Sequence, residues 1–280
     1  MATSVLALAI ASYISLHPAF LLPPIGLLCY DILCQQQTPP AESGSAPTAK
    51  KVAVDQRALP KAIPFAIQLT LMFFAATLFL FSLSRLILTS WQFIPSVYLT
   101  PLQLPDLTPN PGLWWYFFIE MFDAFRSFFL GVFWLHMLSY SIPFCLRLRN
   151  QPLAAMVLML GVINVFQPYA NAGDAGAWLS SLCLLGHSFE GNSINPTAVS
   201  SLHRYSFPAL AALLYCTLLG PAFHHLWIYA GSGNANFFYA ITLVWNLAQL
   251  ILLTDTLYAV LRDEWESERP EGKGREVRQI

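Results

Sequence analysis

Three polar side chains share one face of the last apolar stretch in the sequence. Thr242, Asn246 and Gln249 are spaced by four and then three residues, so they lie on the same side of a helix. Amide groups inside a membrane are costly unless they find hydrogen-bond partners. This face therefore predicts either hydrogen bonds to neighbouring helices or a polar wall that contacts a lipid head group or a partner subunit.

A short polar turn, Gly-Ser-Gly-Asn-Ala-Asn at 231–236, comes directly before this stretch. Glycine, and to a lesser degree asparagine, tolerates the left-handed backbone that tight turns use. We expect Asn236 either to cap the following helix or to contact the phosphate or ethanolamine of a lipid head group. Free amides at a helix N-terminus suit an anionic group, so both roles are compatible with this position.

Charged residues are rare in the apolar stretches, and three of them follow an aromatic-rich helix start: Glu120, Asp123 and Arg126. Asp123 and Arg126 are three residues apart, so we expect them to neutralise each other at the membrane interface. A catalytic carboxylate pair is the less favoured alternative. Asp106 and Asp174 stand alone in loops, which is typical of turn residues.

Known catalytic spacings do not stand out in the sequence. There is no Ser-His-acid arrangement, Cys-His pair or glycine-rich phosphate loop, and the adjacent His224 and His225 are typical of interface residues. The five cysteines have no metal-binding spacing and are expected to be free, buried thiols. A net charge of −1 implies no nucleic-acid partner. We therefore expect no catalytic residue, no metal and no cofactor.

The elements that position these residues are predicted to be membrane helices. Hydrophobic residues make up 56% of the 280 residues and charged residues 10%, whereas globular domains contain about 25% charged residues. A spanning helix needs about 20 mostly apolar residues, and the sequence has about six or seven such stretches. We expect an all-α integral membrane protein, a polytopic helical bundle in which proline makes several helices kinked or short.

Four regions follow from the composition along the chain. Residues 1–30 form a first membrane segment, and residues 31–61 form a polar cytosolic linker whose composition predicts disorder. Residues 62–261 form the polytopic membrane domain, and residues 262–280 form a charged cytosolic tail.

Within the membrane domain we expect six helical stretches. The second begins with aromatic residues typical of a membrane interface and continues as one span, while the third and fourth are short and predict a helical hairpin. The stretches are 62–90, 113–144, 152–167, 175–186, 206–229 and 236–261.

Basic residues predict the orientation in the membrane. If the linker, the turn at Arg147, the loop 187–204 and the tail face the cytosol, these segments contain every Lys and Arg except Arg85 and Arg126. The positive-inside rule then places the C-terminus in the cytosol and the turn at 231–236 on the opposite side.

Several long motifs resemble one family of membrane proteins. They are Ser-Trp-Gln-Phe-Ile-Pro-Ser-Val-Tyr at 90–98, Pro-Asp-Leu-Thr-Pro-Asn at 105–110, Trp-Tyr-Phe-Phe at 115–118 with Glu-Met-Phe at 120–122, and His-Leu-Trp-Ile-Tyr-Ala-Gly-Ser at 225–232 with Asn-Phe-Phe-Tyr-Ala-Ile-Thr-Leu at 236–243. These motifs and their order resemble the PIG-U family, the polytopic U subunit of the glycosylphosphatidylinositol (GPI) transamidase of the endoplasmic reticulum. The similarity runs from about residue 5 to residue 266.

The resemblance implies a function. The complex cleaves a C-terminal hydrophobic signal from a precursor protein and joins the new end to the ethanolamine of a GPI lipid, and its catalytic cysteine belongs to a different subunit. The U subunit is then a non-catalytic partner of the other transamidase subunits that helps to hold the GPI lipid or the precursor's signal in the membrane. Its fold is similar to that of the GPI mannosyltransferases. The expected lipid contacts are Asn234, Asn236, Tyr229, Phe237, Asn246 and Gln249.

Two departures from the family and two alternative functions stay open. Family members are longer, so the resemblance implies that roughly the N-terminal half of the family sequence is not represented in this chain, and Gly191 to Ser201 looks like an insert. One alternative is a membrane glycosyltransferase of the GPI mannosyltransferase type, which needs a luminal acidic motif. The other is a small-solute transporter, a class that often contains internal repeats.

Overall fold

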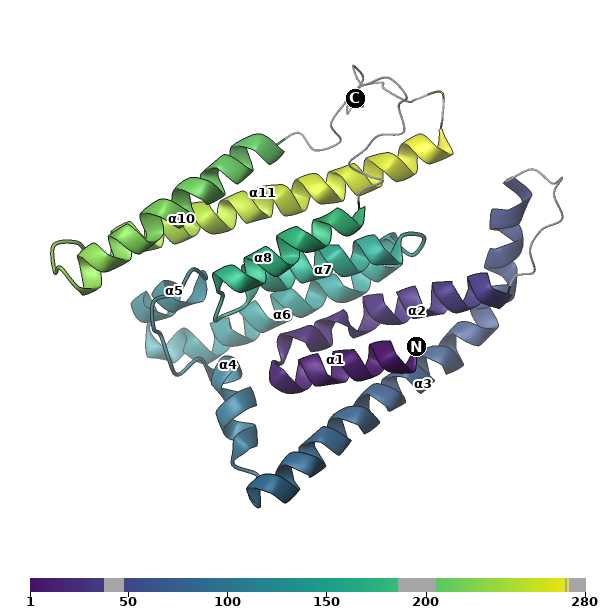
Figure 1. The fold of residues 1–280 in the computed structure, drawn as a ribbon, viewed down its shortest axis with the longest axis horizontal. Helices are drawn as coiled ribbons and strands as arrows, with labels where there is room; N and C mark the ends of the chain where they lie inside the picture. The colour runs from purple at the N-terminus through teal and green to yellow at the C-terminus, as the bar shows by residue number, and fades with distance from the viewer. Residues whose placement is uncertain (38–47, 186–204, 270, 272–280) are drawn as a thin grey trace. The chain divides into compact units, whose positions relative to one another are not determined.

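The computed structural model describes residues 1–37, 48–185, 205–269 and 271. Within these ranges the chain forms ten α-helices and no strand (Figure 1), which confirms the all-α class predicted from composition. Short 3₁₀ segments at His17–Leu21 and Leu182–Leu185 and a π-helical segment at Pro95–Leu99 join some of them. The helices are α1 (Ala2–Ile14), α2 (Leu22–Gln37), α3 (Thr48–Leu88), α4 (Thr100–Gln103), α5 (Trp114–Glu120), α6 (Asp123–Arg147), α7 (Pro152–Phe166), α8 (Ala172–Ser181), α10 (Ser206–Ile228) and α11 (Ala235–Glu268).

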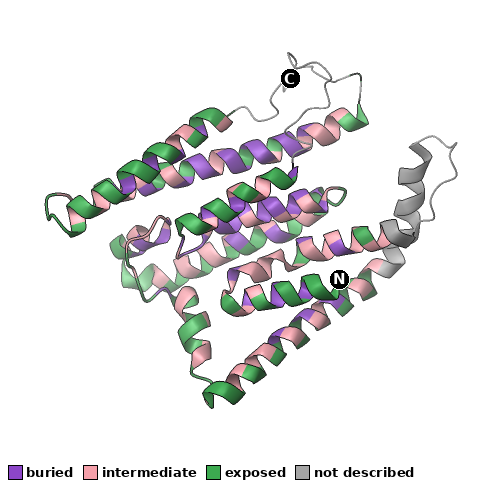
Figure 2. Cartoon of the chain, in the orientation of Figure 1, coloured by how far each residue is buried: buried purple, intermediate pink, exposed green. Residues whose placement is uncertain are grey.

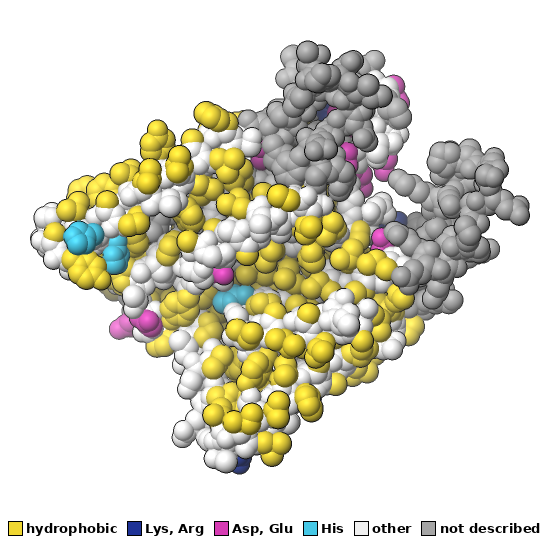
Figure 3. Space-filling model, in the orientation of Figure 1, with side chains coloured by type: hydrophobic (Ala, Val, Ile, Leu, Met, Phe, Trp, Pro, Cys, Tyr) yellow, Lys and Arg dark blue, Asp and Glu magenta, His cyan; other side chains and the backbone are white. Residues whose placement is uncertain are grey.

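Five helical segments in the described ranges are long and apolar enough to cross a membrane. Of the about six or seven predicted spans, five are thus supported. The apolar helices α1 and α7 have only 13 and 15 residues, and a span needs about 20. Hydrophobic side chains dominate the face seen in Figure 3, where charged groups are few. The five segments are His17–Cys34, Ala62–Leu88, Asp123–Arg147, Ser206–Ile228 and Ala235–Glu268.

The chain divides into two compact units, and the first comprises residues 1–103 and 138–159. In this unit α1 and α2 both pack against α3. Its core consists of buried apolar side chains from all three helices, and the hydroxyl of Ser141 in α6 adds a hydrogen bond to the carbonyl of Phe20 at 2.8 Å. The core residues are Val5, Leu8, Ala9, Cys29, Leu69 and Phe73.

The second unit comprises residues 104–137 and 160–280 and contains the α10–α11 hairpin. The two helices lie side by side (Figure 1), and α11 buries one side while the other stays exposed (Figure 2). At Gly161, helix α7 packs closely against α8 and α11. A Cβ atom at Gly161 would lie 2.6 Å from the indole nitrogen of Trp178 and 2.7 Å from Cδ1 of Leu253, so no larger residue fits without displacement.

The prediction of a single helix from Leu113 to Phe144 was wrong, because the structure has two helices here, α5 and α6. The backbone of Met121 is extended, with φ −84° and ψ 142°, and this break separates α5 from α6. Tertiary packing accounts for the break: the indole N–H of Trp114 donates to the carbonyl of Phe166 at 2.8 Å, and Trp114, Trp115 and Phe118 are buried. The aromatic start is thus a separate seven-residue helix fixed within the second unit.

Helices extend into both ends of the range that was predicted as a linker. α2 continues to Gln37, and α3 begins at Thr48 in a stretch rich in Ala and Lys, which are good helix formers. Residues 38–47, the insert predicted at 191–201, and the tail beyond 271 lie outside the described residues.

Candidate functional site

The turn between α10 and α11 is held by backbone hydrogen bonds to the end of α10. The N–H groups of Ser232 and Gly233 donate to the carbonyl of Leu226 at 3.0 and 3.3 Å, and the N–H of Ala230 donates to the carbonyl of His225 at 3.0 Å. Gly231 has a φ of +61°, a left-handed conformation that glycine adopts without strain. The sequence therefore ends α10 abruptly and returns the chain into α11.

Asn234, and not Asn236, is the N-cap of α11. Asn234 has the extended backbone of a cap, φ −138° and ψ 169°, and its side-chain oxygen accepts a hydrogen bond from the N–H of Asn236 at 3.0 Å. The prediction that Asn236 caps the helix was wrong because this residue already lies within the first helical turn.

The side chain of Asn236 instead contacts α5. Its Oδ1 accepts a hydrogen bond from the hydroxyl of Tyr116, and the rings of Tyr116 and Tyr239 stack with their centroids 4.4 Å apart. The pKa of Tyr116 is raised, first by partial desolvation and then by the charge of Glu120 and a side-chain hydrogen bond to it. The phenol therefore stays protonated near neutral pH and remains a hydrogen-bond donor.

Four of the predicted lipid contacts come together at the exposed end of the hairpin. Asn234 and Asn236 are both exposed, and their side-chain oxygens accept hydrogen bonds within the protein, so their NH₂ groups remain as donors. Tyr229 is 73% exposed and stacks on His225, and Phe237 is 55% exposed and stacks on Phe223. This end of the hairpin combines amide donors with exposed aromatic rings.

The other two predicted contacts, Asn246 and Gln249, lie elsewhere. They are 3% and 1% exposed, and Asn246 is ten residues beyond Asn236, or about 15 Å along the helix. The amide of Asn246 donates to the carbonyls of Pro111 and Thr242, each at 2.7 Å, and Gln249 accepts from the amide of Asn164. These partners support the alternative in which the polar face of α11 fixes the bundle, and a lipid contact at either residue stays a prediction.

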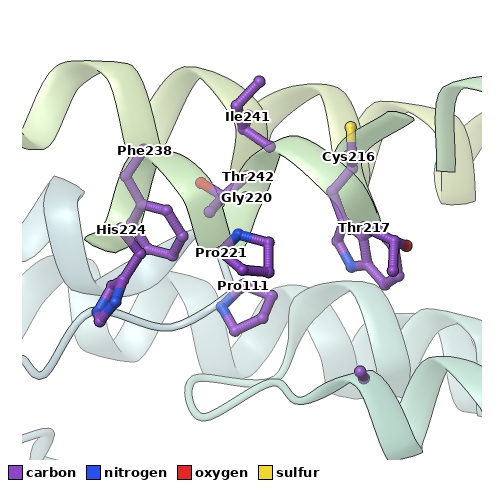
Figure 4. A pocket seen from close by; sticks show the side chains of 11 residues that line it. Pro111, Cys216, Thr217, Gly220, Pro221, His224, Phe238, Ile241 and Thr242 are labelled. Carbon is purple, nitrogen blue, oxygen red and sulfur yellow. The ribbon is translucent and has the colours of Figure 1, made fainter. Parts of the chain in front are cut away.

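An apolar pocket of about 300 Å³ opens beside this polar face, between α10 and α11. Figure 4 shows side chains from both helices and from the loop at Pro111 around it. Gly220 leaves space here, because a Cβ atom at this position would come no closer than 3.7 Å to Ile241. The next residue, Pro221, has no N–H and cannot donate the helical backbone hydrogen bond to the carbonyl of residue 217. The lining residues are Pro111, Ala172, Cys216, Thr217, Gly220, Pro221, His224, Phe238, Ile241, Thr242 and Trp245.

Ring contacts link the pocket to the exposed turn. The ring of His224, which lines the pocket, lies 5.1 Å from the ring of Phe238 and 6.2 Å from that of Tyr229. Sequence reasoning did not predict this pocket. The only signal for it was the Gly-Pro pair inside an otherwise apolar helix.

The charged residues do not form the ion pair that was predicted between Asp123 and Arg126. Arg126 donates to the carbonyl of Leu104 and lies 5.5 Å from the ring centroid of Phe118, whereas Asp123 is exposed at the start of α6. The prediction was wrong because the break after α5 brings the 104–112 loop beside α6 and gives the guanidinium another acceptor.

Asp106 is a turn residue, as predicted, whereas Asp174 lies in the first turn of α8 and not in a loop. The carboxylate of Asp106 accepts from the hydroxyl and N–H of Thr108 at 2.5 and 2.9 Å, which lowers the pKa of Asp106. The carboxylate of Asp174 accepts from Gln167 and Asn171, each at 2.5 Å. Within the described ranges, no three His, Cys, Asp or Glu side chains gather as they would around a metal ion.

The sequence matches the family model described as GPI transamidase subunit PIG-U over residues 1–245. It is 37% identical to the GPI-anchor transamidase component PIGU of Homo sapiens over 262 residues, which are 94% of this chain and 54% of that protein. It is 41% identical to the GPI transamidase component GAB1 of Saccharomyces cerevisiae over 196 residues, which are 70% of this chain and 47% of that protein. The chain thus spans about half the length of the curated relatives it matches.

Proposed function

The chain belongs to the PIG-U family, and we propose that it acts as a non-catalytic membrane subunit of the GPI transamidase in the endoplasmic reticulum. In this role it joins the other transamidase subunits and helps to bind the GPI lipid for attachment to proteins, while another subunit supplies the catalytic cysteine. The names of the relatives support a place in this complex.

The observation that carries the lipid-binding role is the pairing of a donor-rich turn with an apolar pocket on one helical hairpin. A GPI lipid has a polar head group and hydrocarbon chains, so its site must offer both environments. The NH₂ groups of the exposed Asn234 and Asn236 suit the oxygen atoms of the head group. The pocket beside His224 and Phe238 suits an apolar chain. Ligand pockets generally have this apolar lining with a few polar groups at one end.

Hydrogen-bond chemistry also favours phosphate or hydroxyl groups over the ammonium of ethanolamine as the contact at the turn. Both asparagine oxygens already accept hydrogen bonds within the protein, so each amide offers mainly N–H donors to a ligand. An ammonium group is itself a donor and could use only the second lone pair of each of these oxygens.

The orientation in the membrane is part of the same proposal. The distribution of basic residues outside the spans supports a cytosolic C-terminus and a luminal turn at 231–236. A luminal turn could meet the head group of a lipid in the luminal leaflet. The apolar faces of α3 and α10 that remain exposed, including Ile63, Phe79 and Leu214, are available to other subunits or to membrane lipid.

The test is complementation in cells that lack their own PIG-U family component. The chain and its Asn234→Ala/Asn236→Ala double variant are expressed with an affinity tag, and GPI-anchored protein at the cell surface is measured together with co-purification of the transamidase subunits. We expect the double variant to assemble normally but to reduce anchoring several-fold.

Asn171→Ala provides the matched control. Asn171 also caps a helix, accepting from the N–H of Asp174 at 3.1 Å, and it is exposed in the same way. It should leave anchoring unchanged. Full anchoring by the double variant, with normal assembly, would remove the turn from the lipid site. Failure of the unmodified chain to co-purify with the other subunits would contradict the proposed role in the complex.

A further inference from the structure

Arg126 is a cation inside a candidate membrane span, and the described residues give it no anionic partner. It lies one turn into α6, within the apolar segment Asp123–Arg147. Its guanidinium donates to the carbonyl of Leu104 and rests 5.5 Å from the ring centroid of Phe118. Arg126 is half-buried.

None of the nearby acids in the described ranges neutralises this charge. Asp123 precedes Arg126 by three residues, but it is exposed and forms no ion pair with it. The carboxylate of Asp106 is held by the N–H and hydroxyl of Thr108. A guanidinium has five N–H donors, and the carbonyl of Leu104 accepts one hydrogen bond from it. Because Arg126 lies only one turn into the span, its unused donors are close to the level of the lipid head groups, where an external anion would stabilise this arrangement.

Arg126 lies at the same end of the second unit as the α10–α11 turn. The short helix α5 connects the two places: Phe118 contacts Arg126, and Tyr116 contacts Asn236. Residues two apart on a helix point to nearly opposite faces, so the guanidinium and the turn flank α5. A helix with its side chains is about 10–12 Å wide, a distance that the head group of one lipid can span.

We propose that Arg126 binds the phosphate group of a lipid at this face of the membrane. The planar guanidinium can form two parallel hydrogen bonds to phosphate oxygens. The Leu104 carbonyl and the Phe118 ring hold its plane in position. This proposal rests on the proposed function for the identity of the lipid class: the phosphate joins the hydrocarbon part of the lipid to the head group that meets the turn.

The test measures lipid binding to the full chain in detergent by native mass spectrometry. The probes are dioctanoyl phosphatidylinositol, dioctanoylglycerol, which lacks the phosphate, and excess inorganic phosphate as competitor. Arg126→Gln removes the charge but keeps a donor for the Leu104 carbonyl, and Arg126→Lys keeps the charge without the planar fork. Arg85→Gln is the matched control, because Arg85 also lies within a span and contacts an aromatic ring, that of Trp91, at 6.0 Å.

We expect Arg126→Gln to bind the phosphatidylinositol about tenfold more weakly than the unmodified chain, Arg126→Lys to lie between them, and Arg85→Gln to bind normally. Binding of dioctanoylglycerol should be the same in all four proteins. If inorganic phosphate competes with the lipid, the site accepts phosphate in general. If it does not compete, the site is specific for the lipid.

Normal phosphatidylinositol binding by Arg126→Gln would overturn the proposal. So would equal losses in Arg126→Gln and Arg126→Lys accompanied by an equal fall in thermal stability, because Arg126 would then only hold the 104–112 loop in place. These outcomes are separate from the complementation test, which depends on the turn and on complex assembly and does not use purified lipid binding.

Discussion

The hydroxyl of Tyr116 donates a hydrogen bond to the side-chain oxygen of Asn236, 120 residues later in the chain. This contact gives the Oδ1 of Asn236 a partner within the protein and leaves its NH₂ group as a donor. It also joins the short helix α5 to the first turn of α11. One hydrogen bond thus links the polarity of the exposed turn to the packing of the second unit.

Removing this hydroxyl should affect the turn directly. We expect Tyr116→Phe to destabilise the protein and to lower GPI anchoring, because the Asn236 side chain would lose this partner and be free to rotate. Tyr215→Phe, an exposed substitution on α10 at a side chain 63% exposed, is the control. Thermal unfolding in detergent and surface anchoring measure the two effects, and unchanged values for Tyr116→Phe would contradict this role.

The bond between Asn164 and Gln249 should contribute to stability and not to lipid binding. Gln249→Leu leaves the buried amide of Asn164 without its acceptor, and we expect a loss of about 0.5–2 kcal/mol. The double variant Asn164→Leu/Gln249→Leu should recover part of the loss, because no polar group is then left unpaired. Thermal unfolding of the unmodified protein, the two single variants and the double variant gives the coupling energy. Additive losses would show that the two side chains act independently.

Gly161 should tolerate no side chain. Gly161→Ala places a methyl group within 2.6 Å of the Trp178 indole nitrogen, and overpacking of this kind costs about 1–3 kcal/mol. Gly176→Ala in α8 is the matched substitution, since no atom lies within 4 Å of its added Cβ. Thermal unfolding should separate the two variants clearly. Equal stability would mean that α7, α8 and α11 can move apart at no cost.

Filling the pocket should weaken the binding of hydrocarbon without unfolding the protein. Gly220→Leu introduces a side chain beside Ile241, and displacing about two methylene groups of a bound chain would weaken binding about tenfold at roughly 0.8 kcal/mol per methylene. A lipid with a photoreactive acyl chain measures this through cross-linking to the lining residues Cys216 and Trp245. Gly131→Leu in α6, which has open space around its Cβ, should label normally. Undiminished labelling of Gly220→Leu would place the chain elsewhere.

Hydrophobic content and spacing were sufficient to predict the helical class and the shared polar face of α11. The shared face of Thr242, Asn246 and Gln249 follows from helical periodicity alone, and all three side chains are buried. The position of the cap was less certain because Asn234 and Asn236 are the same residue type two positions apart. Only the backbone conformation distinguishes them.

Features that depend on tertiary packing could not be read from the sequence. The break at Met121 has no proline or glycine to mark it and arises where Trp114 is anchored to the carbonyl of Phe166. The partner of Arg126 was mispredicted for the same reason, because spacing along a helix favoured Asp123 while the folded loop supplied Leu104. The pocket is the space left by a small residue, and a sequence records no such space.

The length of α11 sets how far the chain reaches from the bilayer. Its 34 residues make a rod about 51 Å long, whereas the hydrocarbon layer is about 30 Å thick. Up to about 20 Å of the helix can therefore extend beyond the hydrocarbon layer. Near this end the buried Arg262 pairs with Glu266 at 2.6 Å, and its guanidinium lies 4.7 Å from the ring centroid of Trp265.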